Sequence, residues 1–232
     1  MRLRWVVPIA FVCACACGTR EELPADHRDA VASPAPTPVP APVESRPRIV
    51  ALGDSLTAGL GLPIGQAYPA LLQERLNKDG LNYEVVNAGV SGDTSAGGLS
   101  RLDWAFDGDV RVLIVAMGGN DALRGLPVEQ LQHNLGQIIE RAQARGITVV
   151  LAGMEAPPNF GRQYSVAFHQ VYPALARQYH VAFVPFLLQG VAGERALNQP
   201  DGIHPTAQGA RIVADNVWAV LKPIVEGPST RD

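Results

Sequence analysis

The chain has 232 residues, of which 19 are Lys or Arg and 22 are Asp or Glu, so its formal net charge is −3. Hydrophobic residues make up 47% and charged residues 18%, a balance typical of one globular domain with a buried core. Because no run of five or more Lys or Arg occurs, we expect no nucleic-acid partner. The cysteines stand at positions 13, 15 and 17 only, which excludes a disulfide framework or a thiolate zinc site in the rest of the chain.

Residues 1–17 have the pattern of a bacterial lipoprotein signal. A basic start is followed by an apolar segment from Trp5 to about Cys17, which is too short to span a bilayer. Small residues before the cysteines resemble a lipobox, in which a cysteine is lipidated. We expect lipidation at Cys17, with Cys15 as the alternative, and a simply cleaved signal stays open. The sequence therefore predicts export to the cell envelope and a lipid anchor that holds the protein on a membrane, facing the periplasm.

Residues 18–47 are rich in proline, with seven of the 19 prolines between Pro24 and Pro47. Proline fixes φ and lacks an N–H donor, so this stretch favours extended polyproline II over helix or sheet. We interpret it as a spacer. The folded domain is then expected over residues 48–227, followed by a short tail at 228–232.

Strands and helices alternate along the expected domain. Apolar runs bounded by glycine or turn residues predict buried strands, and apolar residues at helical spacing predict the intervening helices. Strands are expected near residues 49–52, 83–86, 110–117, 147–151 and 181–186, and helices near 66–78, 94–106, 128–145, 164–179 and 206–221. This order predicts an α/β fold, a doubly wound five-stranded parallel sheet between two layers of helices.

Small and polar residues gather directly after the first three predicted strands. They are Gly53-Asp54-Ser55, the segment 87–93, and Gly118-Gly119-Asn120-Asp121. The carboxyl ends of parallel strands share one edge of the sheet, where ligands bind in such folds. The segment 201–205, before the last helix, can reach the same edge.

These residues supply the parts that hydrolysis of an acyl bond requires. Ser55 is the expected nucleophile, His204 the general base, and Asp201 the group that orients the imidazole. The expected donors to the oxyanion are the N–H groups of Ser55 and Gly92 and the side-chain amide of Asn120. Taken singly, each motif could be a simple turn. The prediction depends on the presence of all of them in one chain, at one edge of the predicted sheet.

Substrate contacts are expected from the loops beside these residues. The segments 122–126 and 157–164 mix apolar side chains with glycine, which favours a mobile wall for an acyl or aryl group. The residues expected to contact the substrate are Asp54, Leu123, Pro158 and Phe160.

Three other interpretations compete with an esterase. A metal-dependent hydrolase could use Asp54, Asp121, Asp201 and His204, but no spaced histidine pair accompanies them, and we expect no metal. A nucleotide-binding domain is disfavoured because Gly59, Gly61 and Gly65 miss the GxGxxG spacing. A non-enzymatic envelope lipoprotein could instead use this edge as an interaction surface.

The four blocks that contain Ser55, Gly92, Asn120 and His204 resemble those of the GDSL, or SGNH, hydrolases. The likeness runs from about Arg48 to Val225 and is stronger to the bacterial thioesterase I/lysophospholipase L1/arylesterase branch, as in GGNDALRG at 118–125. The resemblance implies a flavodoxin-like sheet ordered 2-1-3-4-5 and hydrolysis of esters and thioesters without a metal or other cofactor. We expect a monomer acting on aryl or short-to-medium acyl esters, with lysophospholipids and acyl thioesters as further candidates.

Overall fold

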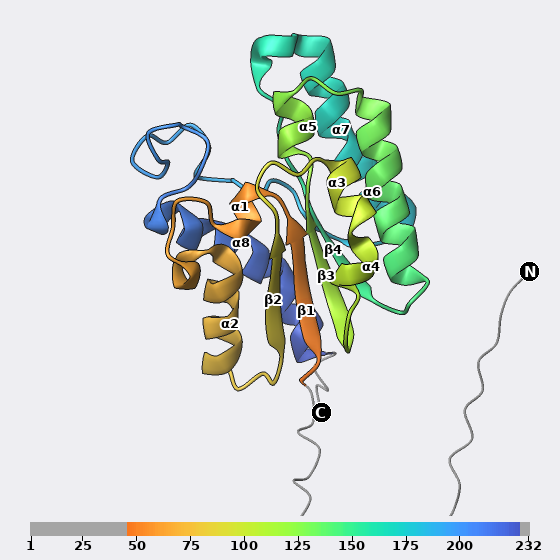
Figure 1. Ribbon diagram of the computed structural model, residues 1–232, viewed down its shortest axis with the longest axis vertical. Coiled ribbons are helices and arrows are strands. Elements are labelled where there is room, and N and C mark those ends of the chain that lie inside the picture. Colours follow the sequence, from red (N-terminus) through yellow and green to blue (C-terminus); the bar gives the residue numbers. More distant parts are fainter. Residues whose placement is uncertain (1–45, 228–232) are drawn as a thin grey trace, which may run out of the picture. The chain divides into compact units, whose positions relative to one another are not determined.

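The structure is a computed structural model that describes residues 46–227. The expected signal, its cysteines, most of the expected spacer and the expected tail fall in residues 1–45 and 228–232, outside the described residues. The described part contains the sheet and every helix discussed below (Figure 1).

Five parallel strands form one sheet in the order β2-β1-β3-β4-β5, which confirms the expected doubly wound arrangement and strand order. They are β1 (Arg48–Gly53), β2 (Glu84–Gly89), β3 (Val110–Ala116), β4 (Thr148–Ala152) and β5 (Ala182–Val184). In the register, Gly53 at the end of β1 lies opposite Gly89 of β2 and Ala116 of β3. The segments that follow these three strands therefore leave the sheet at one level.

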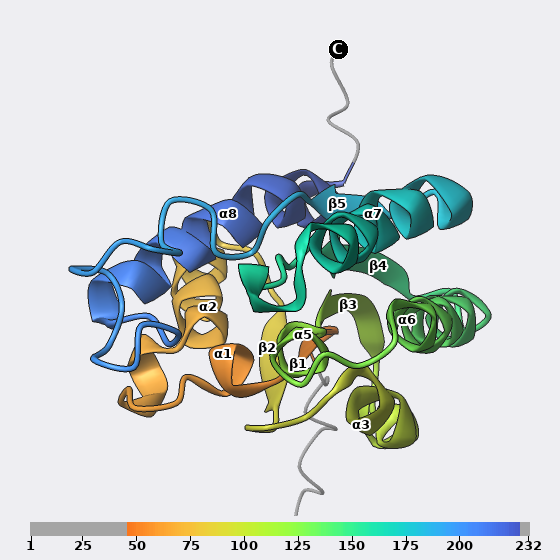
Figure 2. The ribbon, with the colours of Figure 1, turned by 90° about the horizontal axis from the view of Figure 1, so that it is seen from above.

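Helices cover both faces of the sheet (Figures 1 and 2). On one face, α2 (Tyr68–Lys78) contacts β2 and α8 (Ala207–Glu226) contacts β4 and β5, and the two helices contact each other. On the other face, α6 (Val128–Gln143) lies between α3 (Ser95–Ser100) and α7 (Arg162–Tyr179). The short α4 (Leu102–Ala105) follows α3 on this face. Short helices α1 (Ser55–Ala58) and α5 (Gly119–Leu123) begin where β1 and β3 end, and single 3-10 turns occur at η1 (Ile64–Gln66) and η2 (Pro158–Phe160).

The core follows the predicted periodicities. From Ile49 to Gly53, strand β1 is buried at every position, as expected for a central parallel strand covered on both faces. Helix α6 buries the apolar stripe that its sequence predicts, and each of these side chains is at most 1% exposed: Leu131, Leu135, Ile138, Ile139 and Ala142. Burying one such large aliphatic side chain contributes about 1.5–3 kcal/mol, so the sheet and its helices form a firm base for the loops above.

The structure differs from the sequence-based elements in several helices, and β5 (Ala182–Val184) is shorter than the strand expected over 181–186. The helix expected over 94–106 is divided into α3 and α4 at Arg101, which has φ −107° and ψ 13°. The polar segment after β3, expected to be a loop, forms α5 behind Gly118, whose φ is +117°. Helix α8 continues to Glu226, beyond the expected end at Leu221 and past Pro223. None of the helices within residues 46–227 combines the length and apolar character needed to cross a bilayer.

Candidate active site

Ser55 is the first residue of α1, at the end of the central strand β1. Asp54 caps this helix, and its Oδ1 accepts the N–H of Leu56 at 3.0 Å. A side chain at Gly53 would lie 1.9 Å from Thr57 Oγ1 and 2.9 Å from the main-chain oxygen of Ala116, so only glycine fits this turn. Since the first N–H groups of a helix have no partner within it, the Ser55 N–H is available at this turn.

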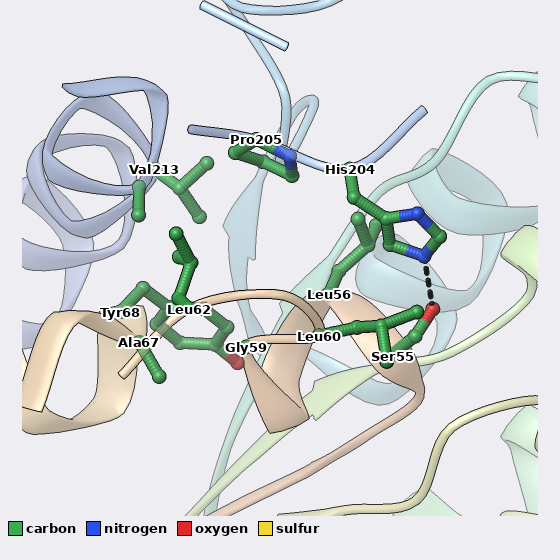
Figure 3. A pocket seen from close by; sticks show the side chains of 11 residues that line it. Ser55, Leu56, Gly59, Leu60, Leu62, Ala67, Tyr68, His204, Pro205 and Val213 are labelled. Atoms are coloured by element: carbon green, nitrogen blue, oxygen red, sulfur yellow. Dashed lines mark hydrogen bonds between the residues drawn. The ribbon is translucent and has the colours of Figure 1, made fainter. Parts of the chain in front are cut away.

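Ser55, His204 and Asp201 form a continuous hydrogen-bonded chain. His204 Nε2 lies 2.8 Å from Ser55 Oγ, and His204 Nδ1 lies 2.7 Å from Asp201 Oδ2. Figure 3 shows the imidazole facing the Ser55 hydroxyl across the edge of the sheet. The structure thus brings together residues that are 149 positions apart in the sequence.

The Asp201 carboxylate is fixed by the tight turn in which it lies. Its Oδ1 accepts the main-chain N–H groups of Ile203 at 2.9 Å and His204 at 3.0 Å, which leaves Oδ2 for the imidazole. These two backbone hydrogen bonds, followed by the bond to the His204 ring, lower the pKa of Asp201 from 3.8 to about 2. The group is therefore ionised at neutral pH and can stabilise a protonated imidazole.

The other two expected oxyanion donors, Gly92 and Asn120, follow β2 and β3. Asn120, in the first turn of α5, donates from Nδ2 to the main-chain oxygen of Asp93 at 2.9 Å and to Asp54 Oδ2 at 3.3 Å. Gly92 has φ +85°, a conformation that strains any L side chain. Its main-chain oxygen accepts from Arg124 Nη2 at 2.8 Å, which holds the loop after β2 against the end of α5.

Asp54 lies beneath this edge and does not line the groove described next. Its side chain is only 2% exposed, and burial raises its pKa from 3.8 to about 6. Asp54 is expected from the sequence to contact the substrate. In the structure its carboxyl group instead caps α1 and accepts a hydrogen bond from Asn120. Helix capping, which was not expected from the sequence, accounts for the acidic residue before Ser55.

A groove of about 470 Å³ lies between the segment after β4 and the segment before α8 and reaches Leu56, the residue after Ser55. Its lining is mainly apolar and includes Leu56, Leu123, Pro158, Phe186, Leu188 and Ile203. Leu123 and Pro158 thus lie where substrate contacts were expected. Phe160 does not line the groove: its ring packs on Tyr164, with the centroids 5.5 Å apart, and lies over Gly125, where an added Cβ would be 2.5 Å away.

A small, mainly apolar crevice of about 10 Å³ is lined by Ser55 and His204 themselves. Figure 3 shows it between Leu60, Leu62, Tyr68 and Val213. This volume has room for about one water molecule, so the groove is by far the larger of the two hollows.

The residues of the metal-dependent alternative are used in other contacts. Asp121 accepts the Ser95 N–H at 2.8 Å and the Ser95 hydroxyl at 2.5 Å, joining α5 to α3. Both ring nitrogens of His204 are engaged by Ser55 and Asp201. Within residues 46–227, no group of three or more His, Cys, Asp and Glu side chains is arranged to hold a metal ion. This alternative is not favoured.

Sequence reasoning missed Arg101 and Asp93, whose side chains form an ion pair at 2.6 Å behind the Gly92 loop. One signal was available: the pair Gly97-Gly98 within a predicted helix indicates close approach by other atoms. An added Cβ at Gly97 would lie 2.8 Å from the Asp93 carboxylate, and one at Gly98 would lie 3.1 Å from Met117.

Comparisons with known proteins place the chain in a family. A family model described as GDSL-like Lipase/Acylhydrolase matches residues 51–212. The Esterase TesA of Pseudomonas aeruginosa is 47% identical over 178 residues, covering 76% of this chain and 89% of that protein. Thioesterase 1/protease 1/lysophospholipase L1 of Escherichia coli K12 is 37% identical over 182 residues, covering 78% and 86%.

Among solved structures, that of AlinE4, a SGNH-hydrolase family esterase, is similar with a TM-score of 0.65 and 44% identity. The match covers 78% of this chain and 97% of that one. Family match, relatives and fold agree with the resemblance of the four sequence blocks. The chain therefore belongs to the GDSL-like lipase/acylhydrolase family, the SGNH hydrolases, and is an enzyme of the ester-hydrolysing class.

Proposed function

We propose that this enzyme is a serine esterase that works through Ser55, His204 and Asp201 and a covalent acyl-enzyme. The observation that supports it is the pair of hydrogen bonds, 2.8 Å and 2.7 Å long, that links the hydroxyl to the imidazole and the imidazole to the carboxylate. A serine hydroxyl is a weak nucleophile at neutral pH unless a base takes its proton, and this chain provides that base.

In the acylation step, His204 Nε2 takes the Ser55 Oγ proton as Oγ attacks the ester carbonyl carbon. The carbonyl oxygen becomes negatively charged, and the N–H groups of Ser55 and Gly92 and the Asn120 amide donate to it. Asp201 holds Nδ1 protonated and stabilises the imidazolium. When the tetrahedral intermediate collapses, the imidazolium gives its proton to the departing alcohol or thiol, and the acyl group stays on Ser55.

In the deacylation step, His204 Nε2 removes a proton from water, which attacks the acyl carbon. A second tetrahedral intermediate is stabilised by the same donors. Its collapse returns the proton to Ser55 Oγ and releases the carboxylic acid. His204 is therefore the base in both half-reactions, and neither half-reaction requires a metal or a redox partner.

The substrates that the groove supports are aryl and short-to-medium acyl esters. Its mainly apolar lining, which includes Leu123 and Pro158, suits a hydrocarbon or aromatic group. The Escherichia coli relative, a thioesterase 1/protease 1/lysophospholipase L1, adds lysophospholipids and acyl thioesters as candidates for this chain. A series of esters that differ only in acyl length would rank these classes by kcat/KM.

The central experiment replaces the nucleophile. Ser55→Ala is expected to abolish ester hydrolysis and labelling by a fluorophosphonate probe, while the thermal unfolding midpoint stays near that of the unaltered protein. Ser165→Ala is a suitable control, because its hydroxyl bonds only to the main chain of its own helix start. Retention of more than a few per cent of activity in Ser55→Ala would overturn the assignment, and absence of labelling in the unaltered protein would favour the non-enzymatic alternative.

We also propose that the enzyme is exported and held in the cell envelope by a lipid on Cys17, with Cys15 as the alternative site. The support is the sequence of residues 1–17 and the proline-rich segment after it. Radiolabelled palmitate should enter the protein in cells, and replacing both cysteines by serine should release it from membranes. No incorporation, together with unchanged membrane association of the double variant, would contradict the anchor without touching the chemistry.

A further inference from the structure

Arg101 lies at the break between α3 and α4, and its guanidinium reaches the carboxyl ends of two strands. Nη2 donates to the main-chain oxygen of Gly53 at 2.8 Å, at the end of β1, and Nη1 donates to that of Ala88 at 2.7 Å, in β2. Nε donates to Asp93 Oδ2 at 2.6 Å. The Arg101 side chain is 18% exposed, so these contacts are only partly screened by water. One cation thus joins the ends of two strands to the loop that follows the second.

Asp93 carries these contacts on to α5. Its carboxylate accepts from Arg101, and its main-chain oxygen accepts from Asn120 Nδ2 at 2.9 Å. Gly92 directly precedes Asp93, and Ser55 follows Gly53 by two residues. Arg101 is therefore connected, directly or through Asp93, to each of the three segments that carry a proposed oxyanion donor.

We propose that Arg101 is a positioning residue that sets the relative placement of the three oxyanion donors. The inference rests on the proposed function, since it assigns Arg101 a role in the site that stabilises the tetrahedral intermediates. The role of Arg101 is indirect, because its contacts are two carbonyl oxygens and a carboxylate of the protein.

The guanidinium suits this task better than other side chains. It is planar and permanently charged, and its N–H donors point in fixed directions, so three acceptors from different segments are held at one spacing. Lysine would place a single flexible point charge there. Donors to an oxyanion stabilise the transition state only when they are already in position, and a displacement of about 1 Å can cost about 100-fold in rate.

Gly97 gives a second, independent way to disturb the same contact. An added Cβ there would lie 2.8 Å from Asp93 Oδ1 and 2.9 Å from its Cγ, so the carboxylate must move. Alanine is a better helix former than glycine within α3. Gly97→Ala is therefore expected to displace Asp93 from Arg101 without a loss of helix propensity.

The test compares steady-state kinetics of the full-length protein and its variants on a soluble short-chain ester. Arg101→Met is expected to lower kcat by about 10–100-fold while KM changes by less than about threefold, because transition-state stabilisation is lost and ground-state binding in the groove is not. A trifluoromethyl ketone, which mimics the tetrahedral intermediate, should lose affinity in parallel with kcat. Arg75→Met is the matched control: Arg75 pairs with Asp215 at 2.7 Å and is 26% exposed, remote from Ser55. Its kcat should stay within about twofold.

A merely structural role for Arg101 predicts a different result. Unfolding would then occur at lower temperature while the folded fraction kept its kcat and its affinity for the ketone, and that outcome would overturn the inference. If Arg101→Met does not fold, Gly97→Ala and Asp93→Asn decide: unchanged kcat in both overturns the inference, and a fall of kcat in both supports it. If Ser55→Ala is inactive but these variants are not impaired, only the inference fails; an active Ser55→Ala removes the proposed function itself.

Discussion

The two halves of the proposed catalytic site are held in different ways. Ser55, Gly92 and Asn120 follow three adjacent strands and are tied together by partly or fully buried side chains, such as Asp54 and Arg101. Asp201 and His204 instead lie in the segment 185–206, between β5 and α8, which contains no helix or strand.

The segment 185–206 is organised mainly by its own turns. The Gln199 N–H donates to the His204 oxygen at 2.7 Å, and the Thr206 N–H donates to the Leu197 oxygen at 2.8 Å. Asp201 and Gly202 are exposed at its tip. The proposed oxyanion donors, which must be in place before charge develops, thus follow the strands of the sheet. The base, which must accept and return a proton, is carried by a loop that a rigid scaffold positions.

Apart from loss of the nucleophile Ser55, the largest effect is expected in the segment 185–206, the loop half of the site. Asp201→Asn should lower kcat by about 10³–10⁴, because an amide cannot hold the productive tautomer or stabilise the imidazolium. The pKa of about 2 for Asp201 means that the carboxylate stays ionised well below neutral pH, so no loss of activity near pH 4–5 should come from this group. Steady-state kinetics from pH 4 to 9 measures both. An Asn variant within tenfold of the unaltered enzyme would mean that the turn alone orients His204.

A smaller loss of kcat is expected from a substitution among the oxyanion donors of the sheet half, which carries Ser55, Gly92 and Asn120. Asn120→Ala removes one donor and should lower kcat by about 10²–10³ with little change in KM. Asn134→Ala is a useful control, because Asn134 is a buried amide that bonds to Ser95 in the same layer, but it is not a proposed donor. Equal kcat losses in the two variants would indicate general loosening of α3 and α5 and would remove Asn120 from the oxyanion site.

Asp54, a buried residue of the sheet half, makes the stability of the folded protein depend on pH. Burial raises the pKa of its carboxyl group from 3.8 to about 6, so the folded state holds the proton more tightly than the unfolded state does. The unfolding free energy contributed by this group therefore falls as pH rises from about 4 to above 6, by up to about 3 kcal/mol. Asparagine caps helices as well as aspartate but does not ionise.

Asp54→Asn should consequently be more stable than the unaltered protein at pH 8 and nearly equal to it at pH 4. Denaturant unfolding at the two pH values measures the difference. Asp103→Asn, at an exposed surface ion pair, should show no comparable gain at pH 8. An Asp54→Asn variant that is less stable at pH 8 would show that the contact with Asn120 outweighs the cost of burying the charge.

The smallest effect is expected where the two halves meet. Gln199 Nε2 donates to the Leu60 oxygen at 2.7 Å and to the Pro205 oxygen at 3.0 Å, linking the loop to the segment after α1. Gln199→Ala should lower kcat by about 3–10-fold, the value of one hydrogen bond of about 1 kcal/mol. Gln189→Ala, at an exposed position of the same segment, is the control. No change in Gln199→Ala would show that the turns of 185–206 place His204 unaided.

The alternation of strands and helices and the edge of the sheet where the proposed site lies could be predicted from the amino-acid sequence, whereas the strand order came from the family resemblance. Apolar periodicity marked the strands and the stripe of α6, and the residues Ser55, Gly92, Asn120 and His204 stood out because each follows a buried element or a turn. Such local patterns are readable since side-chain spacing repeats with the backbone geometry.

Three features that depend on contacts between distant segments could be seen only in the folded structure. The helix expected over 94–106 breaks at Arg101, whose three acceptors lie on residues 53, 88 and 93. Asp54 is buried because the turn after β1 and α5 cover it, and Phe160 is drawn onto Gly125 and Tyr164 and away from the groove. Periodicity reports which face of an element is apolar, but the partner that a polar side chain finds across the fold depends on distances that only the packed structure sets.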